Sequence, residues 1–234
     1  MIPATQLLAQ AALLAKLATP YPFSVGETLT YEAKLGYFPV GTASVSVTRL
    51  VKERGAQAFE FAATGEGGPP GWRVQYDMTS RVETTRFHSL RFHRKLVQGG
   101  KVDEHSYIIV PDSARYREEG RAGDWMAPSD PLDELAFLYY LRSAKLEVGR
   151  SYSLSRYFKT GYNPVQVDVT GRESIDGPDG TVSCLALRVT ARGSTMRAWF
   201  TDDERRLPLQ LDIPLPFGNV TFTLAGQRGS GSAG

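Results

Sequence analysis

The sequence predicts an all-β, mainly antiparallel fold with one central helix near residues 131–143. Apolar and polar residues alternate with a period of two along most of the chain, and turn residues separate these runs about every ten residues. One segment alone combines a helical start signal with a long apolar run. Since about eleven strands are too many for a flat open sheet, we expect a strongly curved meander sheet, a partly closed barrel or a sandwich.

The composition is that of a globular protein. The 234 residues are 41% hydrophobic and 22% charged, which is enough apolar material for a sizeable core. The formal net charge of +2 gives no global field that would attract nucleic acid, so we expect no nucleic-acid partner. The single cysteine, Cys184, lies in a strand-like run and favours a buried apolar role.

The two ends of the chain differ from its middle. Residues 1–19 hold a Leu- and Ala-rich run that we interpret either as a signal-like segment or as an amphipathic helix, because no basic residue precedes it and Lys16 interrupts it. No other segment has the length and apolarity of a transmembrane helix, so we expect no transmembrane span. We expect a single β domain over residues 20–226. Residues 227–234, with the sequence QRGSGSAG, are expected to form a flexible tail.

The first half of the domain carries six predicted strands and one further short candidate. The clearest alternation places Trp72, Val74, Tyr76, Met78 and Val82 on one face and charged or polar residues on the other, which is typical of an antiparallel strand with one solvated face. The expected strands span residues 29–37, 43–47, 58–63, 72–83, 90–97 and 105–110, and residues 114–118 are the short candidate.

A helix interrupts this pattern in the segment SDPLDELAFLYYLRSA. Asp130 is a suitable N-cap, Pro131 suits the first turn, and Asp133 and Glu134 favour the positive end of the helix. Its apolar residues lie on nearly every side, so we expect it to be buried against the concave face or across the mouth of a curved sheet. Strands then resume over residues 152–158, 165–170, 182–189, 195–200, 207–213 and 220–224.

Three segments resemble the family of proteins of unknown function DUF3108. They are the opening PYPFSVGETLTYEAKLGYFPVGTASVSV, the helical DPLDELAFLYYLRSAKLEVGRSYSL, and the final meander with VDVTGRESIDGPDGTVSCLALRV and AWFTDDERRLPLQLDI. The resemblance covers about residues 20–225 in the same order, and its motifs are structural. It implies an exported bacterial protein, periplasmic or associated with the outer membrane, with a mainly β fold and no established activity.

No motif predicts catalysis, a metal or a cofactor. The chain has no G-x-S-x-G elbow, Walker loop or dinucleotide fingerprint. His88 and His93 lie five residues apart and face opposite sides of one strand, and the acidic run at 202–204 is followed directly by two arginines. We therefore expect a protein that is not an enzyme and that has no metal site.

The aromatic residues predict the ligand-binding site. If those on the strands and the helix converge on a concave surface, they form an amphipathic groove for an acyl chain or a sugar polymer; the alternative interpretation is that they belong to the core and that the arginine at the helix end pairs with an acid. The candidate residues are Trp72, Tyr76, Tyr107, Tyr139, Tyr140, Arg142, Tyr157 and Trp199.

The sequence supports three hypotheses for function. The first is a non-enzymatic cell-envelope binding or structural module that holds a lipid or glycan between curved sheet and helix. The second is an enzyme that processes envelope polysaccharide with two carboxylates. The third is an assembly protein that pairs with an envelope protein partner through exposed strands.

Overall fold

A computed structural model of the chain describes residues 21–68, 71–215 and 218–229. The signal-like segment expected at 1–19 lies outside the described residues, as do residues 230–234 of the expected tail. The last strand continues to Arg228, so the sheet extends two residues beyond the expected domain boundary at 226.

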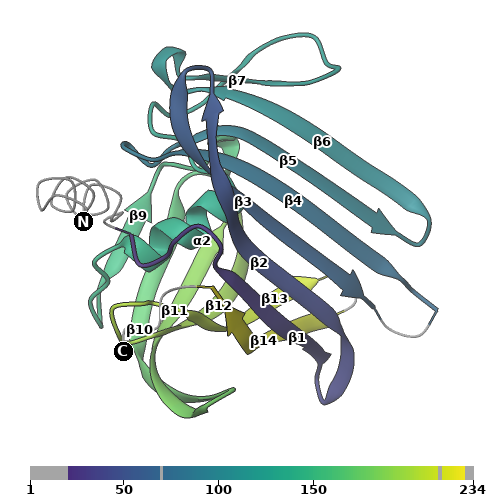
Figure 1. Ribbon diagram of the computed structural model, residues 1–234, viewed down its shortest axis with the longest axis vertical. Helices are drawn as coiled ribbons and strands as arrows, with labels where there is room; N and C mark the ends of the chain where they lie inside the picture. The colour runs from purple at the N-terminus through teal and green to yellow at the C-terminus, as the bar shows by residue number, and fades with distance from the viewer. Residues whose placement is uncertain (1–20, 69–70, 216–217, 230–234) are drawn as a thin grey trace, which may run out of the picture.

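Fourteen antiparallel strands form one curved sheet that does not close (Figure 1). The prediction of an all-β, mainly antiparallel meander is confirmed, and the sheet takes the open, curved form rather than that of a sandwich. The strands are β1 (Thr28–Leu35), β2 (Phe38–Glu53), β3 (Ala56–Gly67), β4 (Val74–Glu83), β5 (Ser89–Gln98), β6 (Lys101–Val110), β7 (Arg115–Glu118), β8 (Trp125–Met126), β9 (Ser151–Leu154), β10 (Val165–Gly177), β11 (Gly180–Ala191), β12 (Ser194–Thr201), β13 (Pro208–Leu215) and β14 (Gly218–Arg228).

The first and last strands are neighbours in the middle of the sheet. Strand β1 pairs with both β2 and β14, so the sheet consists of one arm from β1 to β8 and a second arm from β14 back to β9. The short strands β8 and β9 are therefore its two edges. Strand β8 has only two residues, too few for an alternating pattern, which is one reason why the predicted strand number is too low.

Irregular pairing bends the long strands. The register shifts between Val47 and Arg49 in β2 and between Val169 and Gly171 in β10. Such bulges increase the local bend and twist of a strand. They let one continuous sheet curve around its interior.

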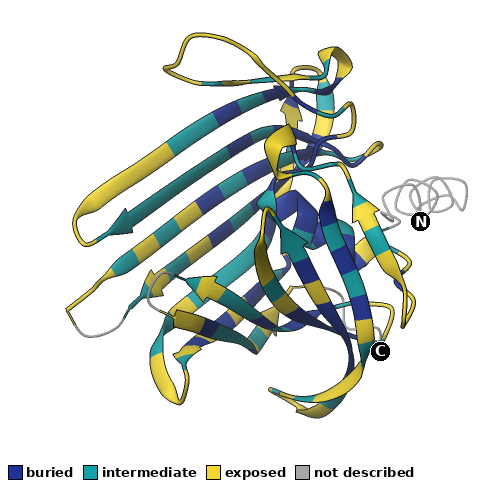
Figure 2. Ribbon diagram, turned by 180° about the vertical axis from the view of Figure 1, so that it is seen from behind, coloured by how far each residue is buried: buried dark blue, intermediate teal, exposed yellow. Residues whose placement is uncertain are grey.

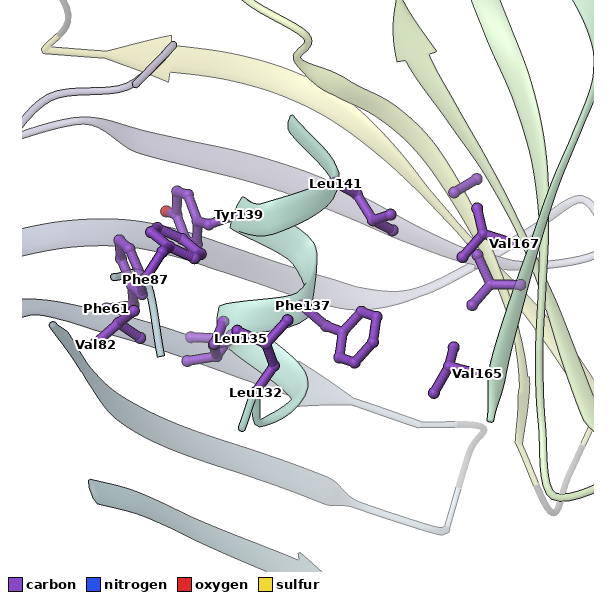
Figure 3. Close-up of a cluster of buried hydrophobic side chains, with 14 of the residues drawn as sticks. Phe61, Val82, Phe87, Leu132, Leu135, Phe137, Tyr139, Leu141, Val165 and Val167 are labelled. Carbon is purple, nitrogen blue, oxygen red and sulfur yellow. The ribbon is translucent and has the colours of Figure 1, made fainter. Parts of the chain in front are cut away.

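The interior of the curve is occupied by helix α2 (Glu134–Ser143), which lies between the two arms (Figure 1). The prediction of a buried central helix is confirmed: Leu135, Ala136, Phe137, Tyr139 and Leu141 are all buried. Phe137 points toward Val165 and Val167 of β10, whereas Tyr139 lies beside Phe61 of β3 (Figure 3). Buried and exposed residues alternate along the surrounding strands (Figure 2).

The helix begins later than the sequence predicts. Its N-cap is Asp133, whose carboxylate accepts hydrogen bonds from the backbone N–H groups of Leu135 and Ala136, so the expected capping role of Asp130 is wrong. Leu132 precedes the helix and forms an isolated parallel bridge with Tyr157. This bridge ties the start of the helix to the segment after β9.

Candidate ligand-binding site

Charged side chains face the interior at one end of the first arm. On β5, Phe92 is a core residue, so Arg94, two positions later, points to the same side of the sheet. Arg94 pairs with His105 of β6, which precedes the core residue Tyr107 by the same two positions. We call this set the inner polar cluster, and it consists of Tyr76, Arg94, Asp103, His105, Tyr107, Glu118, Glu134, Tyr157 and Lys159.

Glu134 and Tyr157 connect the start of helix α2 with the segment after β9. The Tyr157 hydroxyl donates a hydrogen bond to Glu134 Oε1 over 2.7 Å. Burial, followed by the negative charge of Glu134, raises the pKa of Tyr157 far above its usual value. Tyr157 therefore stays protonated and acts as a donor.

His105 lies between two carboxylates. Its Nδ1 is 2.5 Å from Glu118 Oε1, and its Nε2 is 2.7 Å from Asp103 Oδ1. Arg94 Nη2 donates to the other oxygen of Asp103 over 2.8 Å. Partial burial opposes the charged form of Asp103, but His105 and Arg94 outweigh it and lower the pKa of this carboxyl.

Lys159 contacts the ring and the hydroxyl of Tyr107. Its Nζ donates to the Tyr107 hydroxyl over 2.8 Å and lies 4.2 Å from the centroid of the same ring. Burial lowers the pKa of Lys159, and burial with the charge of Glu118 raises the pKa of Tyr107 to about 12. The pair presents a phenol that stays neutral beside a partly desolvated amine.

Two buried polar atoms of the cluster have no hydrogen-bond partner among the described residues. They are Arg94 Nε, a donor, and Glu134 Oε2, an acceptor. Burial disfavours the charge on Arg94, but the nearby charges of Glu134 and then Asp103 outweigh this and raise its pKa. Because buried polar atoms are normally paired, these two unsatisfied atoms on groups whose charges interact make the cluster the candidate site.

The family model for proteins of unknown function (DUF3108) matches residues 30–225. The chain belongs to the DUF3108 family. No curated protein matches the sequence.

One solved structure shares the fold of this DUF3108 protein. The crystal structure of a beta-barrel-like protein of DUF1849 from Brucella abortus is 8% identical, with a TM-score of 0.59 over 87% of this chain and 97% of that one. A DUF1089 family protein from Pseudomonas aeruginosa is 12% identical, with a TM-score of 0.41 over 71% of this chain and 87% of that one. At these identities the first likeness establishes the fold alone.

Three of the predicted site residues meet in the inner polar cluster of the DUF3108 chain. They are Tyr76, Tyr107 and Tyr157, and the charge of Glu134 contributes to the raised pKa of each, after burial. The Tyr76 hydroxyl also lies 2.8 Å from Met78 Sδ.

Tyr139 and Arg142 lie in the core instead. Arg142 is 2% exposed and its guanidinium forms an ion pair with Glu27, with Nη2 3.1 Å from Oε2. It also donates to the backbone oxygens of Pro22 and Arg205. The alternative interpretation, in which this arginine pairs with an acid, therefore applies, and we assign both residues to folding.

The other three predicted residues lie apart from the cluster. Trp199 is buried in a second, smaller core and its Nε1 donates to Glu173 over 2.8 Å. The guanidinium of Arg156 lies over the ring of Tyr140, with its Cζ 4.6 Å from the ring centroid. Trp72 lies before β4 and is 46% exposed.

Sequence reasoning missed Arg94, His105, Glu134 and Lys159 as members of a site. The signal for Arg94 was available, because it is a charged residue on the same face as Phe92. The helix dipole alone accounts for Glu134 at the start of a helix, so its sequence context indicates no further role. Nothing local to Lys159 indicates that it reaches Tyr107, which lies 52 positions away in the sequence.

The described residues offer few other sites. A groove of about 720 Å³ is lined largely by hydroxyl and charged side chains, among them Ser44, Thr64 and Asp77, but no unpaired buried atom lies in it. Within the described ranges, no group of three or more His, Cys, Asp or Glu side chains is arranged to hold a metal ion. No helix of the described part is long and apolar enough to cross a membrane.

Proposed function

We propose that this DUF3108 protein is a non-enzymatic binding module of the bacterial cell envelope, located in the periplasm or at the outer membrane, and that the inner polar cluster binds a glycan. The observation that carries the proposal is the unpaired donor at Arg94 Nε together with the unpaired acceptor at Glu134 Oε2, on two side chains whose charges interact. A sugar hydroxyl both donates and accepts, so sugar hydroxyls can satisfy both kinds of atom.

A glycan fits the cluster better than an acyl chain. The space between helix and sheet is filled by core side chains such as Phe61 and Tyr139, whose ring centroids are 3.9 Å apart. The accessible part of the cluster instead combines tyrosine rings with hydrogen-bonding groups, and its cations Arg94 and Lys159 are offset by carboxylates. This combination suits a neutral, hydroxyl-rich ligand.

The arrangement favours binding over hydrolysis. A general acid needs a carboxyl with a raised pKa that reaches the substrate. Burial raises the pKa of Asp133 to about 7, but this residue is fully buried and caps helix α2. The cluster carboxyl with a shifted pKa, Asp103, has a lowered one.

Native mass spectrometry of the protein isolated from its own cell-envelope fraction tests the proposal. We expect a co-purifying mass that is released by glycosidases and is not removed by lipid extraction. Arg94→Gln should lower its retention about tenfold, because hydrogen bonds to a charged group contribute about 1.5–3 kcal/mol.

The matched control is Arg150→Gln, which removes an exposed arginine outside the cluster. Equal retention by the two variants, or a co-purifying mass that consists of phospholipid alone, contradicts the proposal. Tyr139→Ala is unsuitable for this test because it removes a core ring.

A further inference from the structure

Three hairpin turns lie at the same end of the first arm. A continuous row of paired residues crosses β1 to β6 through Ala33, Gly41, Gly67, Val74, Gln98 and Lys101. The β1–β2 and β5–β6 turns and the described ends of the β3–β4 connection all follow directly beyond this row, and Figure 1 shows them along one side of the molecule, toward the lower right. These turns lie side by side at the strand ends of the first arm.

Large aromatic side chains project from this row of turns. Tyr37 is 98% exposed and Phe38 is 76% exposed, which makes them the most exposed large hydrophobic residues of the described part. Trp72, 46% exposed, lies at the next turn, and its ring lies over Gly99 of the third turn. We call Tyr37, Phe38 and Trp72 the aromatic rim.

Charges behind the rim are layered in the same order in all three hairpins. A basic residue lies nearest each turn, namely Lys34, Arg73 and Lys101, and an acidic residue lies further back, namely Glu32, Glu66 and Asp103. Arg73 and Lys34 each contact the acid behind them, at 3.3 Å and 4.0 Å. From the tip inward, the order is aromatic, basic and acidic.

We propose that the aromatic rim inserts shallowly into a lipid leaflet and attaches the protein to a membrane surface. Aromatic side chains favour the interfacial region, lysine and arginine favour the anionic phosphates just above it, and carboxylates favour the water beyond. The layering is thus complementary to the polarity of a leaflet. This membrane contact does not depend on the glycan-binding proposal, since the aromatic rim and the basic residues behind it lie outside the inner polar cluster, and Asp103 alone is common to both.

Vesicle sedimentation of the full chain tests the rim. With vesicles of three parts phosphatidylethanolamine to one part phosphatidylglycerol, the triple variant Tyr37→Ser, Phe38→Ser, Trp72→Ser should bind at least about tenfold more weakly than the parent chain. The control, Leu50→Ser with Met126→Ser, removes exposed apolar side chains elsewhere in the same arm and should change binding less than about twofold.

Two further measurements locate the contact. Brominated acyl chains should quench the fluorescence of the parent chain, and Trp72→Phe should abolish that quenching; this readout separates the rim from the apolar run at residues 7–18, which has no tryptophan. Replacing Lys34, Arg73 and Lys101 with glutamine should remove the gain that phosphatidylglycerol gives over pure phosphatidylcholine vesicles.

Three results overturn the proposal. One is a parent chain that binds no vesicles, and another is equal binding by the rim variant and the control. The third is that analytical ultracentrifugation shows self-association of the parent chain, and that the rim variant abolishes this self-association without changing vesicle binding. That result would make the rim a protein interface. Circular dichroism of each variant confirms that a loss of binding is not a loss of fold.

Discussion

Single residues in this protein combine charge with deep burial. Arg142, at the end of helix α2, pairs with Glu27 just before β1 and reaches the Arg205 carbonyl between β12 and β13. One guanidinium therefore joins three segments that are distant in sequence. The same burial makes either charge costly when its partner is absent.

Arg142→Met should lower the free energy of unfolding by about 3–5 kcal/mol, because it leaves the Glu27 carboxylate buried without its cation. Adding Glu27→Leu to this variant should restore most of the loss, since an apolar pair replaces an ion pair. Urea denaturation measures both, with Arg150→Met as the exposed control. A double variant no more stable than the single one would contradict this explanation.

Asp133 should give the protein a characteristic dependence on pH. Burial raises the pKa of this acid from 3.8 to about 7, so the folded state holds its proton more tightly than the unfolded state. Stability from this group is fully present below pH of about 4 and is lost as the pH rises toward about 7, by at most about 4 kcal/mol.

Denaturant titrations of the parent chain and of Asp133→Asn across this pH range measure the effect. Asparagine retains a capping side chain and does not titrate, so the difference in unfolding free energy between the two proteins should shift in favour of the variant as the pH rises. A difference that is constant with pH would refute the assignment.

At the scale of elements, the helix illustrates what a sequence can and cannot specify. Its apolar character on all sides predicts both its existence and its burial. Its start depends on partners elsewhere: Ser80 of β4 donates to the Asp133 carboxylate, and the Asp133 N–H donates to the Ser89 hydroxyl of β5. Two acids three positions apart cannot be ranked as caps without those strands.

Asp133→Ala should therefore lower the unfolding free energy by about 2–3 kcal/mol, through loss of the cap and of the buried partner of Ser80. Asp130→Ala should cost less than about 1 kcal/mol, because it removes only a partly exposed ion pair with Arg156. Thermal or urea unfolding of the two variants compares them directly, and similar losses would disprove the reassigned cap.

For the whole molecule, the pairing of β1 with β14 decides the shape. The alternation of apolar and polar residues predicts the individual strands. The pairing of the first strand with the last leaves no local signal in the sequence of either strand. The alternation marks Arg94 as a charged residue on the core face, but the assembly of the inner polar cluster leaves no local signal, since it joins β4 to β7 with residues of the helix and of the segment after β9. Residue type alone indicates the three tyrosines that meet there, because their spacing in the sequence does not show that they are neighbours.

The shared core predicts a single unfolding transition. Residues of both arms, such as Phe61 and Val167, belong to one buried cluster around helix α2. Phe137→Ala, which removes a ring pointing at β10, should lower the unfolding free energy by about 3–5 kcal/mol. Circular dichroism and tryptophan fluorescence should still report one midpoint, and two separate midpoints would mean that the arms unfold independently.

The adjacency of β1 and β14 also bears on how the chain could be rewired. Thr28 pairs with Arg228, and Gly229 lies against the backbone of Gly26, at the end of β1 opposite the aromatic rim. A short linker could join these two points, and new ends could be opened at the exposed β11–β12 turn, as a circular permutant. Such a protein would keep every strand pair of the parent sheet while moving both ends to another site.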